Sequence, residues 1–401
     1  MSDVEHVIIG SGPAGLAAAA FGPTDALVIE ARQSPGWKIL ISANGRCNVT
    51  NTFPPAQFLH RVMRGSRQLK TALGAFGPED IRAWLADLGC PTVVQNGWEV
   101  YPKSNRAADV LQALLNTAAA NGAQLLCDAR VTSVKKTSGG FVIGTRHGEI
   151  SCRRLLVAAG SPAWGRPQPQ FDQSLGRLGH TLRPWVPGLC PIPLTDNPFD
   201  GLEGISFTGS MILEGKSGEA DEILLTGDGL SGPAALNASA RVFRRLYDGD
   251  GDDFALDLFP AQSRGGTLQW LLDSRRSHGP RAVPAILADA FPKRLAVRLA
   301  EISGAAEVPA AQLKRSDAER LSDLLHSFPC RVAGMPSLAK GFAGSGGIPL
   351  EEVDTKTMQS KIVRGLFFGG EILDYDAPTG GFNITLALAT GRLAGLSMAS
   401  P

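Results

Sequence analysis

Hydrophobic positions recur along the chain at two spacings, and the change of spacing marks the expected elements. Near the N-terminus the apolar run His6–Ile9 leads through glycines into the alanine-rich run Leu16–Ala20, which is typical of a buried strand followed by a helix. Residues 123–160 alternate between apolar and polar, with turns at 138–140 and 147–148. This pattern predicts a meander of strands that closes on the apolar strand Leu155–Ala158.

The middle of the chain changes pattern twice more. From about Trp185, short strands alternate with proline- and glycine-rich turns, which predicts a β-rich region with strands at 188–193, 205–213, 222–225 and 254–258. Between Thr267 and Phe328 apolar residues recur every three or four positions, which predicts helices. Near the C-terminal end, Leu366–Phe368 again has the character of a buried strand.

The glycines after the first strand form a G-x-G-x-x-G motif. Gly10 suits the tight turn, Gly12 lets the backbone approach a pyrophosphate, and Gly15 lets the helix pack closely on the strand. A second strand at 26–29 ends in Glu30, where a carboxylate can bind the ribose of an adenosine. Gly22 and Pro23 shorten the intervening helix by about one turn. We expect the adenosine diphosphate of a dinucleotide to contact Gly10, Ser11, Gly12, Pro13, Ala14, Gly15, Glu30 and Ala31.

The C-terminal segment adds a second glycine-rich unit. The strand 366–368 runs into Gly370 and Glu371, whose carboxylate can accept hydrogen bonds from a polyol or a ribose. Gly380 and Gly381 then open a helix at Phe382-Asn383-Ile384, and the free N–H groups of a helix start favour negative charge. We expect this helix start to face an anionic ring, with no room for a side chain at Gly381.

Several separated motifs carry a resemblance to a known family. They are Lys38-Ile-Leu-Ile-Ser-Ala-Asn-Gly-Arg-Cys-Asn-Val-Thr-Asn51, Tyr101–Val110, Gly229-Leu-Ser-Gly-Pro233, Lys356–Lys361 and the C-terminal glycine elements. Nearly the whole chain resembles the bacterial flavoprotein family that includes aminoacetone oxidase, a bile-acid-reducing (BaiN-like) branch and a ribosomal RNA dihydrouridine synthase branch. The resemblance implies FAD as cofactor and adds these contacts to it: Lys38, Gly45, Arg46, Cys47, Asn48, Val131, Ala159, Gly160, Gly370, Glu371, Gly380, Gly381, Phe382, Asn383 and Ile384.

The chain also departs from the family pattern. Ala43 and Gly344 stand where the family usually has glycine and threonine, and Gly227 stands where many members have histidine. These changes leave the substrate open. Because no second strand–G-x-G-x-x-G–helix unit follows, NADH or NADPH is expected to bind at most transiently, as an electron donor.

The predicted fold is α/β. It comprises a two-dinucleotide-type Rossmann FAD-binding domain (1–184 and 340–401), an inserted β-rich domain (185–262 and 328–339) and a small helical subdomain (263–327). The 401 residues, 43% of them hydrophobic, are ample for more than one core.

Composition narrows the setting. A formal net charge of +1 gives no global field for nucleic acid or membrane, and no apolar run is long enough to span a bilayer. Six scattered cysteines without C-x-x-C pairing argue against a metal site and against a disulfide scaffold. With no signal peptide, these features predict a cytoplasmic protein; they leave the oligomeric state open.

No catalytic acid or base stands out in the sequence. Asp374, Tyr375 and Asp376 are the candidates for lining a cavity beside the ring, and a hydrogen-bonded turn is the equal alternative. Cys47 is more consistent with a packed thiol than with a nucleophile, and His180 with a capping or packing role.

Three functions compete at this point. The first is an FAD-dependent oxidoreductase that transfers hydride to or from flavin N5 on a small-molecule substrate. The second is an RNA-modifying flavoenzyme that reduces a uridine in rRNA, for which residues 261–327 offer ten Lys/Arg against seven Asp/Glu. A solvated helix face would give the same counts. The third is a non-catalytic FAD-binding scaffold, which nothing in the sequence favours.

Overall fold

A computed structural model describes residues 2–165 and 168–400. The chain divides into two compact units: unit 1 comprises Met1–Trp185 and Ala343–Pro401, and unit 2 comprises Val186–Phe342. Each unit has its own hydrophobic core. Unit 1 therefore joins the two ends of the chain, with unit 2 inserted between them.

Unit 1 is organised around a mainly parallel sheet. Its central strands run in the order β21 (Leu366–Phe368), β9 (Gly148–Val157), β1 (Ser2–Ile9), β2 (Leu27–Ile29) and β6 (Gln124–Leu126). Apolar residues such as Ile8, Leu156 and Phe367 are completely or almost completely buried, as expected for strands covered on both faces. The carboxyl ends of β1, β2 and β9 therefore meet at one edge of the sheet.

The predicted meander extends this sheet. β7 (Val131–Thr137) pairs with β8 (Gly140–Thr145), and β8 pairs with β9, all antiparallel. Gly140 and Gly148 have φ of +143° and +117° at the two turns, which glycine adopts without strain. The β9 strand returns to lie beside β1, so the meander ends where the glycine turn begins.

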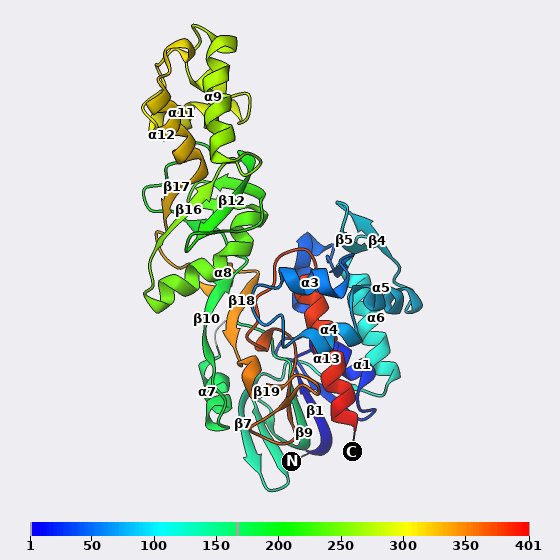
Figure 1. The fold of residues 1–401 in the computed structure, drawn as a ribbon. Helices are drawn as coiled ribbons and strands as arrows, with labels where there is room; N and C mark the ends of the chain where they lie inside the picture. The colour runs from blue at the N-terminus through cyan, green and yellow to red at the C-terminus, as the bar shows by residue number, and fades with distance from the viewer. Residues whose placement is uncertain (1, 166–167, 401) are drawn as a thin grey trace. The chain divides into compact units, whose positions relative to one another are not determined.

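Two helices of unit 1 pack unusually closely. α1 (Pro13–Phe21) lies against α13 (Phe382–Ala399), as Figure 1 shows with the blue and red helices. A Cβ on Gly391 would overlap the backbone of Ala14, and a Cβ on Gly395 would lie 2.8 Å from Cα of Ala18. Only glycine at these two positions allows the helices to approach to this distance.

The remaining elements of unit 1 surround this frame. They are α2 (Trp37–Ile41), a 3-10 turn at Ser42–Gly45, β3 (Thr50–Asn51), α3 (Pro55–Arg61), α4 (Lys70–Ala75), α5 (Pro78–Asp87), β4 (Thr92–Gln95), β5 (Glu99–Pro102), α6 (Ala107–Ala120), α7 (Pro169–Arg177), β19 (Val353–Asp354) and β20 (Gln359–Ser360). β10 (Arg183–Gly188) and β18 (Ala343–Gly347) form a separate two-stranded ribbon.

Unit 2 combines an antiparallel sheet with helices. The strand order is β11 (Ile192–Pro193), β15 (Gly229–Ser231), β14 (Asp221–Thr226), β12 (Ser206–Leu213), β16 (Asp253–Asp257) and β17 (Phe328–Arg331). The segment predicted to be helical contains α9 (Arg264–His278), α10 (Pro284–Leu287), α11 (Lys293–Ile302) and α12 (Arg315–His326). The domain boundary at 262/263 within this unit stays a prediction.

One helix of unit 2 was not anticipated in the sequence. α8 (Gly232–Asp248) occupies 17 residues inside the region predicted to be β-rich. Its start has Pro233 at the first turn, and Gly249 ends it with φ +80°. Ala235, Val242 and Phe243 are buried against the sheet. This spacing of apolar residues was the signal that the emphasis on short strands overlooked.

Candidate functional site

The turn after β1 leaves an open space in front of a helix N-terminus. Gly10 has φ +101°, and a Cβ there would overlap the carbonyl oxygen of Ala158. A Cβ on Gly15 would overlap the carbonyl oxygen of Gly10. A Cβ on Gly12, by contrast, would meet no heavy atom within 4 Å. Gly10 and Gly15 thus serve packing, while Gly12 keeps clear the space in which backbone N–H groups can bind a phosphate.

Glu30 lies directly beside this turn. Its carboxylate accepts hydrogen bonds from the Ser11 backbone N–H (3.2 Å), the Ser11 hydroxyl (2.5 Å) and the Arg32 backbone N–H (2.8 Å). Ser11 is completely buried. The second strand therefore holds its terminal carboxylate against the glycine turn, as the motif predicts.

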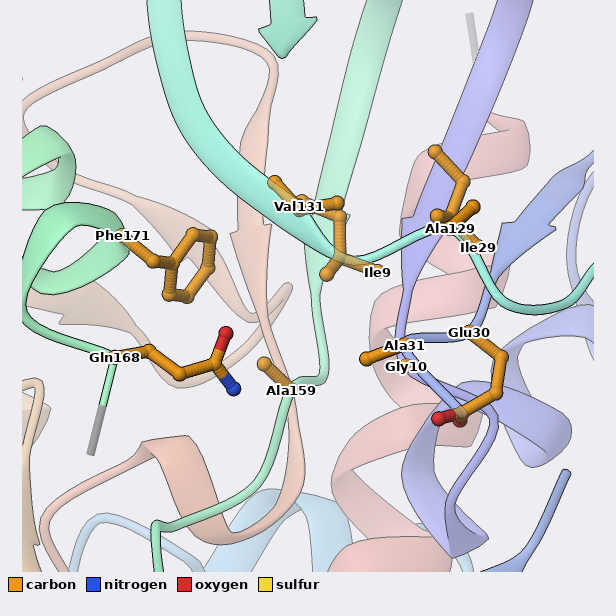
Figure 2. Close-up of a pocket in the computed structure, with 10 residues that line it drawn as sticks. All are labelled: Ile9, Gly10, Ile29, Glu30, Ala31, Ala129, Val131, Ala159, Gln168 and Phe171. Carbon is orange, nitrogen blue, oxygen red and sulfur yellow. The ribbon is translucent and has the colours of Figure 1, made fainter. Parts of the chain in front are cut away.

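A cavity opens between these residues and the end of β9. Its lining consists of Ile9, Gly10, Ile29, Glu30, Ala31, Ala129, Val131, Ala159, Gln168 and Phe171. Figure 2 shows Glu30 and Ala31 on one side of it and Gln168 on the other. Five residues predicted to bind a cofactor, namely Gly10, Glu30, Ala31, Val131 and Ala159, share this cavity. Gln168 and Phe171 were not anticipated, because nothing in their local sequence resembles a binding motif.

A second hollow adjoins the cavity through shared walls at Ala159, Gln168 and Phe171. Asp172 and Trp185 complete its lining together with Gly160, Ser161, Pro162 and Ile372. Burial raises the pKa of Asp172 to about 6. This carboxyl group, which the sequence did not single out, can therefore change protonation near neutral pH.

Lys38 and Glu371 form an ion pair although 333 residues separate them. The Lys38 Nζ lies 2.6 Å from Glu371 Oε2 and also donates to the carbonyl and hydroxyl oxygens of Ser161. The other carboxylate oxygen of Glu371 accepts from the Gly344 backbone N–H at 2.9 Å. Gly160 lies next to this pair, since a Cβ there would be 3.7 Å from Nζ. The cluster places one cation and one anion at the end of β9.

The loop at residues 42–48 has an unusual backbone. Ala43, Asn44 and Cys47 have φ of +48°, +55° and +61°, a region that residues with a side chain rarely adopt. Arg46 is exposed, and its guanidinium lies 4.7 Å from the centre of the Tyr101 ring. The loop is therefore held in a strained conformation, which is a common feature of functional loops.

The thiol of Cys47 in this loop is not available as a nucleophile. Cys47 is completely buried, and burial raises its pKa to about 12 against a smaller lowering by a hydrogen bond with Ser42. At neutral pH the group is a neutral thiol, and the thiolate is the reactive form. The packing interpretation agrees with this environment. The neighbouring Asn48 donates to Glu99 at 3.0 Å, while its buried Oδ1 has no partner among the described residues.

The start of α13 is built on two left-handed glycines. Gly380 and Gly381 have φ of +91° and +81°; a Cβ on Gly380 would overlap the Trp98 ring, and one on Gly381 would overlap the carbonyl oxygen of Thr50. The protein's own packing therefore requires both glycines. We expected a flavin ring to be the group that excludes a side chain at Gly381, and the neighbouring backbone already accounts for that requirement.

The three residues that follow anchor the helix. Phe382 is buried, with its ring 4.4 Å from the Phe58 ring, and Ile384 packs beside the helical core. The Asn383 amide donates to the carbonyl oxygens of Ala377 (3.2 Å) and Pro378 (3.1 Å). It thus shapes the loop before the helix, and its amide N–H groups are engaged within the protein.

Asp374 and Asp376 are held by arginines from distant segments. The Arg64 guanidinium lies 2.6 Å from Asp376 and 3.1 Å from Asp374, and Arg183 lies 2.7 Å from Asp374. The Asp374 side chain is only 2% exposed, so its buried carboxyl group has two guanidinium partners in place of water. Tyr375, which separates the two aspartates in the sequence, is buried. Its burial, together with the nearby Glu371 carboxylate, raises the pKa of its hydroxyl well above the usual value. A catalytic role for any of the three stays a hypothesis.

A carboxylate–imidazole–hydroxyl arrangement also occurs in unit 1. His180 Nδ1 lies 2.8 Å from Glu352, and Nε2 lies 2.8 Å from the Ser360 hydroxyl. The Ser360 oxygen already accepts the backbone N–H groups of Ile362 and Val363, and the His180 side chain is inaccessible to solvent. These contacts hold β20 in place, and the Ser360 hydroxyl is not arranged as a nucleophile. The arrangement agrees with the packing role expected for His180.

Fold and site together define a dinucleotide-binding α/β protein. Two observations fit a bound adenine dinucleotide: the empty space in front of Gly12, and the cavity that the Glu30 carboxylate lines together with Gly10. Residues 4–397 match the profile described as HI0933-like protein Rossmann domain, and the chain belongs to this family. The predicted family and the predicted Rossmann-type fold are thereby confirmed.

Curated relatives cover almost the full chain. It is 28% identical to the 3-dehydro-bile acid delta(4,6)-reductase of Clostridium scindens, with 98% of each chain aligned. It is 26% identical to the ribosomal RNA dihydrouridine synthase of Escherichia coli, with 96% of each aligned. Among solved structures, a 3-ketosteroid-delta4-(5alpha)-dehydrogenase from Rhodococcus jostii, 15% identical, superimposes with a TM-score of 0.52 over 100% of this chain and 97% of that chain, which shows the shared fold.

These findings confirm the predicted class, an enzyme of the flavoprotein oxidoreductase type. Among the described residues, no helix is long and apolar enough to cross a membrane. The same part of the chain holds no cluster of three or more His, Cys, Asp or Glu side chains placed to bind a metal ion.

Proposed function

We propose that the protein is an FAD-dependent oxidoreductase that acts on a small organic molecule. The observation that carries this proposal is the cavity in which the G-x-G-x-x-G turn, Glu30 and the end of β9 converge. Such an arrangement suits an adenosine diphosphate, because the turn addresses the phosphates and the carboxylate addresses the ribose.

The chain's own groups would bind and orient the cofactor. The α1 N-terminus behind Gly12 offers N–H groups to the diphosphate, and Glu30 accepts from the ribose. The Lys38–Glu371 pair lies at the end of β9, where Glu371 can accept from the polyol while Lys38 supplies positive charge. When bound, FAD supplies hydride chemistry at its N5. The N-terminus of α13 would stabilise negative charge on the reduced ring.

For the substrate we propose a compound with a carbon–carbon double bond conjugated to a carbonyl group. The support is the Clostridium scindens relative, whose name describes reduction of such bonds in a bile acid. NADH or NADPH would serve as a transient electron donor, since only one glycine-turn unit is present in the sequence. We expect the reaction to take place in a reducing cytoplasm, in keeping with six free cysteines.

The alternative, reduction of a uridine in rRNA, has the Escherichia coli relative in its favour. The basic residues of unit 2 give it little further support. Arg275 donates to the carbonyl oxygens of Leu272 and Leu313, and Arg315 and Arg320 pair with acidic neighbours on α12. The donors of Arg275 are thus engaged within the protein, and carboxylates offset the charges of Arg315 and Arg320, which leaves these three residues with less to offer RNA phosphates.

The test starts with the purified 401-residue chain. We expect a yellow protein whose heat-released cofactor is FAD and not FMN, and whose colour NADH or NADPH bleaches under anaerobic conditions. The reduced protein should be reoxidised by a 3-oxo-4-ene steroid and not by the matched saturated ketone. A colourless chain that does not bind added FAD would refute the proposal. Loss of dihydrouridine from rRNA in a deletion strain would favour the alternative instead.

A further inference from the structure

The wall of the dinucleotide cavity opposite Glu30 comes from an element that no binding motif predicts. Gln168 precedes α7, and Phe171 lies in its first turn. Both line the cavity together with Glu30, Ala31 and Val131. The wall therefore lies across from the groups that would hold the ribose, at the place left for the base.

The Gln168 side chain is free to bind a ligand. Figure 2 shows its amide directed into the cavity, towards Ala159 and below the Phe171 ring. Within residues 2–165 and 168–400 the amide forms no hydrogen bond, although the backbone carbonyl of Gln168 accepts from Asp172 at 3.0 Å. Phe171 is only 4% exposed, so its ring is a fixed part of the wall.

A primary amide presents a donor and an acceptor side by side. This pair matches the N6 amino group and the N7 acceptor of adenine, which is why glutamine and asparagine recognise adenine in nucleic acids. At this N7 edge hypoxanthine presents two acceptors, O6 and N7, so that the same amide can satisfy only one of them. An aromatic ring at the base adds a contact that does not depend on which purine is bound.

We propose that Gln168 and Phe171 recognise the base of the dinucleotide, with Gln168 selecting adenine over hypoxanthine and Phe171 providing an apolar surface for either. This inference rests on the proposed dinucleotide site and names the residues that set its specificity. It also assigns a role to the segment between β9 and α7.

The experiment measures nucleotide binding and not turnover. The 401-residue chain, freed of flavin, is titrated calorimetrically with ADP and with IDP, which differ only in the base. The variants are Gln168→Ala and Phe171→Leu. Gln173→Ala is the matched control, because Gln173 is an exposed glutamine in α7, the helix that Gln168 precedes. Thermal unfolding of each variant verifies that the fold is retained.

We expect the unaltered chain to bind ADP at least about fivefold more tightly than IDP. Gln168→Ala should reduce this ratio to within about twofold, whereas Phe171→Leu should weaken both nucleotides and leave the ratio unchanged. Gln173→Ala should behave as the unaltered chain. Equal binding of ADP and IDP by the unaltered chain, or a ratio unaffected by Gln168→Ala, would overturn the inference. A separate titration with FAD tests the proposed function on its own. If the proposed function fails, the chain binds ADP but not FAD; if only the inference fails, the chain still binds FAD.

Discussion

Replacement of Glu30 by alanine tests the cofactor site most directly. The carboxylate can accept about four hydrogen bonds, and the Ser11 N–H, the Ser11 hydroxyl and the Arg32 N–H already supply three. One position is thus left for a ribose hydroxyl. A single hydrogen bond to a charged group contributes about 1.5–3 kcal/mol. Glu30→Ala should therefore raise the dissociation constant for FAD by about 10- to 150-fold.

We expect the opposite result for Ser11, whose N–H and hydroxyl already donate to the Glu30 carboxylate. Ser11→Ala removes the 2.5 Å hydroxyl contact and frees a second acceptor position for the ribose. We expect FAD to bind this variant as tightly as the unaltered chain, or more tightly. Fluorescence titration of flavin-free protein measures both constants. A Glu30→Ala constant within about threefold of the unaltered one, or an equal loss in Ser11→Ala, would refute the reasoning.

Three further predictions address other parts of unit 1. Gly12→Ala should leave thermal stability unchanged but weaken FAD binding. Gly381→Ala should lower the unfolding temperature even without FAD, because its Cβ would overlap the neighbouring backbone and its φ is +81°. Equal melting temperatures of the two flavin-free variants would contradict this. Cys47, with its pKa raised to about 12, should stay unmodified when native protein is treated with iodoacetamide at pH 7.5 and analysed by mass spectrometry; prompt alkylation would contradict its burial. Burial raises the pKa of Glu352, but hydrogen bonds from Thr181 and His180 outweigh it and hold the pKa below the usual 4.5. Its contribution to stability is thus present above pH 4.5 and is lost as pH falls through the lowered value, so Glu352→Gln should destabilise the protein at pH 7 and progressively less in urea titrations below pH 4.

Local rules were sufficient for those parts of the fold that depend on neighbouring residues. The glycine turn, the meander turns and the strand 366–368 follow from backbone freedom and from apolar runs, and the structure contains all of them. The helix α8 was missed because the apolar spacing at Ala235, Val242 and Phe243 lies among glycine- and proline-rich strands that dominated the interpretation of this region. The helix is amphipathic, and its apolar spacing is the sequence feature that indicates it.

The site was harder to predict where it depends on contacts between distant segments. The sequence indicated Lys38 and Glu371 separately, but their pairing across 333 residues is a property of the folded sheet. Arg64 and Arg183, which neutralise Asp374, have no local signature at all. Gln168 and Phe171 reach the cavity only because α7 folds back after β9. Such groups are brought together by tertiary structure, and a single sequence contains no direct record of it.

The contact of α1 with α13 sets an order of events during synthesis. The helix α1, whose N-terminus we propose as a phosphate site, is made first, and α13, which packs on it through Gly391 and Gly395, is made some 370 residues later. β21, which completes the parallel sheet beside β9, is also late. A ribosome adding about 5–20 residues per second needs tens of seconds to span that interval. Until α13 and β21 are made, α1 lacks its packing partner and β9 lacks its neighbour, so the proposed cofactor site can be completed only late in synthesis.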